Sequence, residues 1–193
     1  MLFVLLYPNL FPDKYERLLS LANFWNTIEY FFPYKYMTDQ KWDEVLSEMI
    51  PKFINAKNEK EYNLLMLETV VKTDDGHGIF KTNQTVNYFG TFFFPAVIKI
   101  IEGKAIVTEI PNDSLARINN IKIGDLIEKI NEKSINEIIN AKLKYISGSN
   151  EYSKLRDTYY FLANGQTDKV ELSIVRNNEK INYVFLTTKH LII

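Results

Sequence analysis

The sequence contains no cysteine, which excludes disulfides, thiolate catalysis and cysteine metal sites. Its two histidines, His77 and His190, lie far apart in the chain, so we expect neither a zinc site nor a cofactor. The chain also has no large excess of charge of either sign, because its 23 basic and 24 acidic residues give a net charge of -1. The chain therefore lacks the positive field that nucleic acid requires, and no nucleic-acid partner is predicted.

Long hydrophobic runs are absent as well. Residues 1–8 are apolar but too short to span a membrane, and no basic residue precedes them as in a secretory signal. They fit either a trimmed leader or a short segment that packs on the first helix. We therefore predict no membrane span, whereas 46% hydrophobic residues in a chain of 193 are enough to bury a core.

The first part of the chain has the spacing of helices. A helix is predicted from residue 13 to Pro33, and Thr38 is expected to cap a second one over residues 42–53. Pro51 is expected to kink the second helix or to mark where it restarts. The apolar face predicted for the first helix consists of Tyr15, Leu18, Leu19, Ala22, Trp25, Ile28 and Phe32.

A third helix begins at Asn58, which has capping-box spacing to Glu61, and it is expected to reach Thr73. After the loop at residues 74–78 the hydrophobic period changes from helical to alternating. The predicted strands are residues 92–94, 97–101, 105–110, 126–130, 170–175 and 181–186.

Turn and cap residues divide this second part. The pair Gly124-Asp125 predicts a turn, because glycine adopts conformations that a side chain penalises and aspartate can accept from neighbouring amides. Ser134 is expected to cap a helix over residues 135–145, and residues 155–162 suggest another short helix. The pair Asn177-Asn178 tolerates the positive backbone angles of a hairpin turn between the last two strands.

These patterns predict an α+β fold in two domains. Residues 1–86 form an amino-terminal helical bundle, and residues 87–193 form a β-sandwich or partial barrel with one or two helices.

Two stretches carry a family resemblance. The runs FWNTIEYFFPYKY (24–36), WDEVL (42–46) and IPKFINA (50–56) resemble the amino-terminal helical region of tail-specific and tricorn-like serine peptidases. The stretch from residue 93 through Gly124-Asp125 to residue 157 resembles the PDZ domain that follows this region in the same family. The resemblance implies a PDZ-like second domain, and it places the nucleophilic serine in a larger catalytic core that we expect to be absent from this chain.

The resemblance also implies a role for His77. In tricorn-like members a histidine in an Asp-x-His loop before the PDZ domain is the general base, and Asp75-Gly76-His77-Gly78 matches that loop. Gly78 departs from the family, which commonly has a residue there that can form a hydrogen bond. A base without a nucleophile is inactive, so a histidine that only stabilises a glycine-rich loop is the alternative. Ser147 and Ser149 lack a Gly-x-Ser-x-Gly elbow and are expected to end a helix and begin a loop.

A PDZ domain binds an extended carboxy-terminal peptide as an added strand. The edge strand is placed at residues 97–101 and the opposing helix at 135–145, with Phe94, Val97, Ile138 and Ala141 predicted to line the peptide cleft. Each of these four residues fits an ordinary core position equally well.

Two functions follow from these expectations. In the first, the chain is the non-catalytic helical and PDZ portion of a tail-specific or tricorn-like peptidase, inactive alone, which captures polypeptide substrates for a catalytic core located downstream or in trans. In the second, it is a free-standing adaptor that binds protein carboxy termini without a protease partner. The resemblance implies a cell-envelope location, although no export signal is visible.

Overall fold

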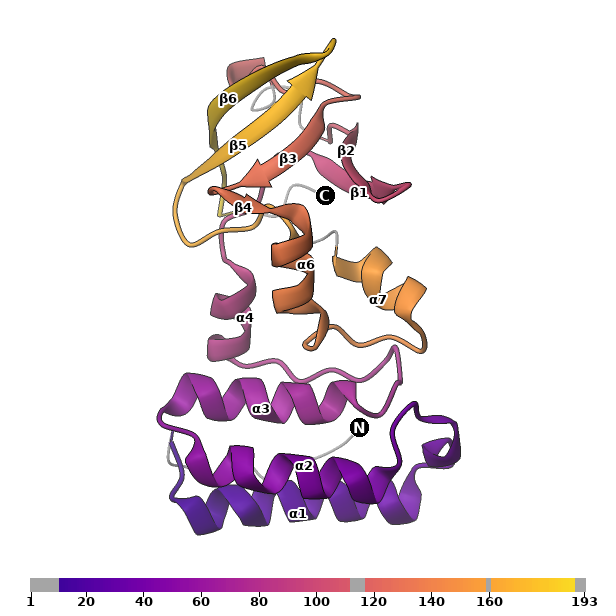
Figure 1. Cartoon of the computed structure of the whole chain (residues 1–193). Coiled ribbons are helices and arrows are strands. Elements are labelled where there is room, and N and C mark those ends of the chain that lie inside the picture. Colours follow the sequence, from indigo (N-terminus) through magenta and orange to yellow (C-terminus); the bar gives the residue numbers. More distant parts are fainter. Residues whose placement is uncertain (1–10, 112–116, 159–160, 190–193) are drawn as a thin grey trace. The chain divides into compact units, whose positions relative to one another are not determined.

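The computed structural model describes residues 11–111, 117–158 and 161–189, and it has the α+β fold that the sequence predicts (Figure 1). By its internal contacts the chain divides into two compact units. A helical unit contains residues 1–85 together with 147–150, and a sheet unit contains residues 86–146 and 151–193. None of the described helices is long and apolar enough to cross a bilayer. Residues 1–8, considered above as a leader, lie outside the described part of the chain.

The helical unit is built on α1 (Lys14–Phe31), α2 (Trp42–Asn55) and α3 (Glu59–Val71), with a 3-10 turn at Lys35–Met37. Asp13 caps α1 through a complete capping box with Glu16, which satisfies amides that have no partner within the helix. Side chains from the three helices form one apolar core, whose fully buried members are Leu21, Val45, Met49, Phe53 and Met66.

Several local predictions for these helices are wrong. The buried face of α1 runs through Leu21, Phe24 and Ile28, whereas Tyr15 and Leu19, two members of the predicted face, are exposed. The 3.6-residue period allowed more than one apolar stripe here, because aromatic residues surround the helix. Thr38 does not cap α2, since its hydroxyl donates to the carbonyl groups of Lys35 and Gln40, and α2 begins after Lys41.

Pro51 lies inside α2, which continues through it to Asn55 without restarting. Asn58 caps α3 as predicted, because its side chain accepts from the amide of Glu61. The capping box is not closed on Asn58, however, since the carboxylate of Glu61 accepts from the amide of Lys57 instead. The first bond is enough to begin the helix.

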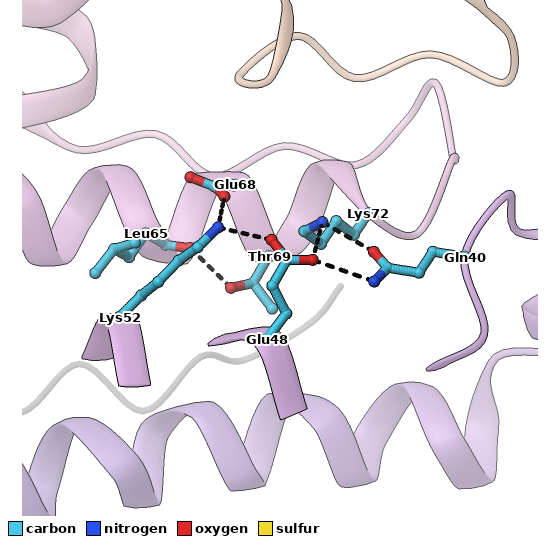
Figure 2. A network of polar contacts seen from close by, with 7 residues as sticks. All are labelled: Gln40, Glu48, Lys52, Leu65, Glu68, Thr69 and Lys72. Atoms are coloured by element: carbon cyan, nitrogen blue, oxygen red, sulfur yellow. Dashed lines mark hydrogen bonds and ion pairs between the residues drawn. The ribbon is translucent and has the colours of Figure 1, made fainter. Parts of the chain in front are cut away.

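A polar network joins α2 to α3 (Figure 2). Lys52 Nζ lies 2.7 Å from Glu48 Oε1 and 2.5 Å from Glu68 Oε1, while Lys72 Nζ lies 2.9 Å from Glu48 Oε2. Burial alone would raise the pKa of Glu48, but hydrogen bonds from Lys52, Lys72 and Gln40 outweigh it and lower that pKa to about 2. Glu68 is buried, and its carboxylate is paired with Lys52, as a buried charge must be.

The second unit contains a six-stranded antiparallel sheet that does not close. Its main path runs in the order β1-β2-β3-β5-β6, and β4 pairs with β3. The strands are β1 (Val97–Ile101), β2 (Lys104–Glu109), β3 (Leu126–Ile130), β4 (Lys133–Ser134), β5 (Lys169–Arg176) and β6 (Glu179–Leu186). An isolated bridge between Phe93, before β1, and Thr188, after β6, brings the two ends of the path together as in a partial barrel. The predicted strand at residues 92–94 is reduced to this bridge and one between Phe92 and Gly165.

The Gly124-Asp125 turn forms as predicted. Gly124 has a φ of +92°, and the Asp125 carboxylate accepts from the amide of Lys122. Asp125 is almost completely buried, and its two oxygens each lie 2.6 Å from a guanidinium nitrogen of Arg176. This bidentate pair fastens the turn before β3 to the end of β5.

Three further helices are described: α4 (Asn83–Phe89), α6 (Ile135–Leu143) and α7 (Glu151–Thr158). Ser134 caps α6 in a complete capping box, which confirms the predicted start. The helix predicted at residues 155–162 is shifted, because α7 begins and ends four residues earlier. The hairpin between β5 and β6 turns at Asn177 and Asn178, whose φ angles of +51° and +66° confirm the predicted turn chemistry.

Candidate functional site

His77 lies in the loop that follows α3. Its amide donates to Asp75 Oδ1 over 2.9 Å, and its ring Nδ1 lies 3.3 Å from the same oxygen. The amide of Gly78 donates to the carbonyl of Asp75 over 2.9 Å, so Asp75 organises the whole turn. Asp74 has a φ of +50°, and its carboxylate accepts from the amide of Asp39.

This geometry suits a proton acceptor. When a neutral imidazole donates its Nδ1 hydrogen to a carboxylate, Nε2 keeps the lone pair that can accept a proton. The His77 side chain is 99% exposed, so Nε2 is open to solvent. Gly78 has no side chain that could contact the ring, and Asp75 supplies such a contact instead. That His77 acts as a base stays a prediction.

A distant segment packs against this loop. Residues 147–150 belong to the helical unit, and Ser147 Oγ donates to the carbonyl of Gly78 over 2.5 Å. A Cβ placed on Gly76 would lie 4.0 Å from the Cα of Gly148, so two glycines lie where these backbones approach. The sequence did not predict this contact, because 69 residues separate Ser147 from Gly78.

The contact does not make a serine nucleophile. Ser147 uses its hydroxyl hydrogen on the carbonyl of Gly78, and within the described residues no hydrogen bond joins Ser147 to the ring of His77. A catalytic serine must instead donate to its base. The expectation that Ser147 and Ser149 begin a loop agrees with their positions after α6, which ends at Leu143.

The four predicted cleft residues differ in accessibility. Ile138 is buried in the core of the sheet unit, and Phe94 packs against that core with its ring 5.7 Å from the ring of Phe185. Val97 is partly buried at the start of β1, beside an irregularity in its pairing with β2. Ala141 is exposed on α6, and its carbonyl accepts from the hydroxyl of Tyr88. Val97 and Ala141 are thus the two that an incoming chain could reach without displacing core side chains.

The strand β1 is an edge of the sheet, as a peptide acceptor must be. Val107 of β2 exchanges hydrogen bonds with Gly124 and Asp125, so its polar groups point away from β1. Its cross-strand partner is Ile98, and strand geometry then turns the N–H and C=O groups of Ile98 and Ile100 toward the open edge. Within residues 11–111, 117–158 and 161–189 no further strand pairs with these backbone groups, which leaves them available to an added strand.

The sheet unit also has a hollow of about 560 Å³ on β3, β5 and β6. Lys129, Glu171, Ser173 and Asn182 contribute polar groups to it, and Val184 contributes an apolar one. No local sequence pattern predicted this hollow, because alternating burial along β5 and β6 is typical of any sheet with one face on a core.

The arrangement defines a class of fold, a three-helix unit joined in sequence to an open antiparallel sheet with helices. Comparison with solved structures finds this fold in mature CPAF complexed with lactacystin, with a TM-score of 0.61 and 12% identity over 90% of this chain and 35% of that chain. The crystal structure of mature CPAF gives a TM-score of 0.61 and 11% identity over 90% of this chain and 34% of that one. The photosystem II D1 C-terminal processing protease gives a TM-score of 0.44 and 13% identity over 91% and 44% of the two chains.

At this identity the likeness to CPAF shows a shared fold alone, and the chain spans about a third of the length of that protein. No protein-family model matches the chain, and no curated protein sequence matches it significantly.

Proposed function

We propose that this chain is the helical and PDZ-like portion of a tail-specific or tricorn-like serine peptidase. It binds extended or carboxy-terminal segments of polypeptides, and a serine-bearing core that is not among these 193 residues hydrolyses them. His77 supplies the general base when that core is present. The proposal combines the sequence resemblance with a fold shared with CPAF over 90% of the chain.

The open edge of β1 is the observation that carries the binding role. Ile98 and Ile100 present backbone groups to a strand that the chain itself does not provide in its described part. Main-chain pairing of this kind gives affinity without fixing the sequence that is bound, and side chains beside the edge give specificity. Val97 and Ala141 are the accessible members of the predicted cleft.

Peptide binding can be tested on the 193-residue chain by fluorescence anisotropy. A labelled peptide ending in an apolar residue with a free carboxylate is expected to bind with a Kd on the order of micromolar. Ala141→Glu places a charge at an exposed position of α6 in the predicted cleft and is expected to weaken binding about tenfold, roughly 1.4 kcal/mol. Asn140→Glu is the matched control, because Asn140 is also exposed but lies about 200° around the helix from Ile138.

The same titration can refute the binding role. A carboxy-amidated peptide is expected to bind much more weakly, since it lacks the terminal charge that backbone amides would hold. Equal binding of the amidated peptide, or equal loss in the Ala141 and Asn140 variants, would show that no such cleft operates.

The catalytic part of the proposal has a separate test. The chain alone is expected to hydrolyse no peptide, since in the described residues no serine hydroxyl bonds to His77. Hydrolysis by the purified chain that disappeared in His77→Ala would contradict the division between binding portion and core.

A further inference from the structure

We propose that Ser147 is a positioning residue for His77, and that it acts through the carbonyl of Gly78. This role deepens the proposed function, because it matters only if His77 works as a base. Ser147 touches no reacting atom in this scheme. It holds the loop from which the imidazole projects.

The hydrogen bonds that Asp75 accepts within the loop are local. Asp75 accepts from the amides of His77 and Gly78, through its side chain and its carbonyl respectively. Both bonds lie within three residues, and the His77 side chain itself is 99% exposed. Packing therefore does not fix the ring, whose position depends on the backbone that carries it.

Ser147 provides a long-range bond at the histidine end of the loop, whereas the amide of Asp39 binds Asp74 at the start of the loop. Its hydroxyl donates to Gly78, the residue immediately after the histidine, over 2.5 Å. A Cβ on Gly78 would lie 3.1 Å from the carbonyl oxygen of Asp75, 3.2 Å from Val70 Cγ1 and 3.6 Å from Ser147 Oγ. The loop thus lies between α3, its own turn and the serine, and a side chain at Gly78 would be tight against Asp75 and Val70 but only in ordinary contact with Ser147.

Gly76 and Gly148 also lie where the loop after α3 approaches residues 147–150. Gly148 is buried, and its Cα lies 4.0 Å from where a Cβ of Gly76 would be. Two segments far apart in sequence thus approach at two positions, Gly76 with Gly148 and Gly78 with Ser147. Among the described contacts between these two segments, the hydrogen bond comes from the serine, so its removal loosens the loop without unpacking a core side chain.

The inference can be tested without turnover. In the ¹⁵N-labelled 193-residue chain, the ring nitrogen shifts of His77 report the tautomer, and amide hydrogen exchange reports opening of residues 77 and 78. The variant His77→Ala assigns the ring signals against those of His190. Ser147→Ala is expected to speed exchange of the Gly78 amide about fivefold, the loss of one hydrogen bond. It is also expected to shift the neutral ring away from the Nδ1–H form that Asp75 favours.

Two variants complete the design. Ser147→Thr keeps the hydroxyl and is expected to restore both signals, while Ser149→Ala removes an exposed hydroxyl two residues away and is expected to leave them unchanged. The proposal is overturned if Ser147→Ala leaves tautomer and exchange as in the wild type, or if Ser147→Thr fails to rescue them. Because neither signal requires peptide binding or a catalytic core, a failure of the proposed function would leave this test intact.

Discussion

Asp125→Ala is expected to destabilise the sheet unit by about 3 kcal/mol. The carboxylate is 2% exposed and accepts two bonds from Arg176 and one from the amide of Lys122. Breaking a buried pair by removing one partner typically costs about 3–5 kcal/mol, because the remaining charge stays uncompensated. We expect the lower end, since the Arg176 side chain is 13% exposed and keeps its bond to the carbonyl of Asn120.

The assay must report on the sheet unit alone. Both tryptophans, Trp25 and Trp42, lie in the helical unit, so their fluorescence follows only that unit. Amide NMR signals from β3 and β5, followed against urea, resolve the other unit. With a denaturant slope of about 1.5 kcal/mol/M, the loss of about 3 kcal/mol lowers the midpoint by about 2 M.

An exposed ion pair in the same sheet provides the control. Lys180 Nζ lies 2.9 Å from Glu128 Oε2, with side chains 77% and 38% exposed. Glu128→Gln is expected to change stability by less than about 0.5 kcal/mol. If Asp125→Ala cost no more than Glu128→Gln, the argument that burial makes the turn aspartate structural would be wrong.

Three further predictions concern the helical unit, and the tryptophan fluorescence follows each in urea. The pKa of Glu48 is lowered to about 2, so its contribution to the free energy of unfolding is complete above about pH 4.3 and is progressively lost as the pH falls toward 2. Glu48→Gln should therefore reduce the loss of stability between these pH values by about 1 kcal/mol, after allowance for the exposure of the side chain. An equal loss in the variant would refute this. Asp13→Ala removes the α1 cap and should cost about 1 kcal/mol, and an unchanged midpoint would contradict it. Gly78→Ala should cost about 1 kcal/mol, because its Cβ would press on Asp75 and Val70; a stabilised variant would show that the loop yields freely.

The elements that the sequence predicted correctly are those whose signals are local. The cap at Ser134, the turn at Gly124-Asp125 and the hairpin at Asn177-Asn178 each depend on one or two residues with a specific backbone role. The α+β fold followed from the change of hydrophobic period after residue 78, and the placement of residues 97–101 as the edge strand came from the resemblance. The face predicted for α1 was right at Ile28 but wrong at Tyr15 and Leu19. A helix with aromatic residues all round has no single period, and packing against α2 and α3 adds Leu21 and Phe24 to the buried side.

In the candidate site, too, the local contact could be predicted from the sequence and the long-range contact could not. The Asp75 contact to His77 spans two residues, so the motif already contained the means of orienting the ring. The Ser147 contact spans 69 residues and depends on how the chain returns after α6, which no local pattern encodes. Because an exposed imidazole gains its precision from the backbone beneath it, the part of the site that could not be predicted is the part that would decide whether His77 is held for catalysis.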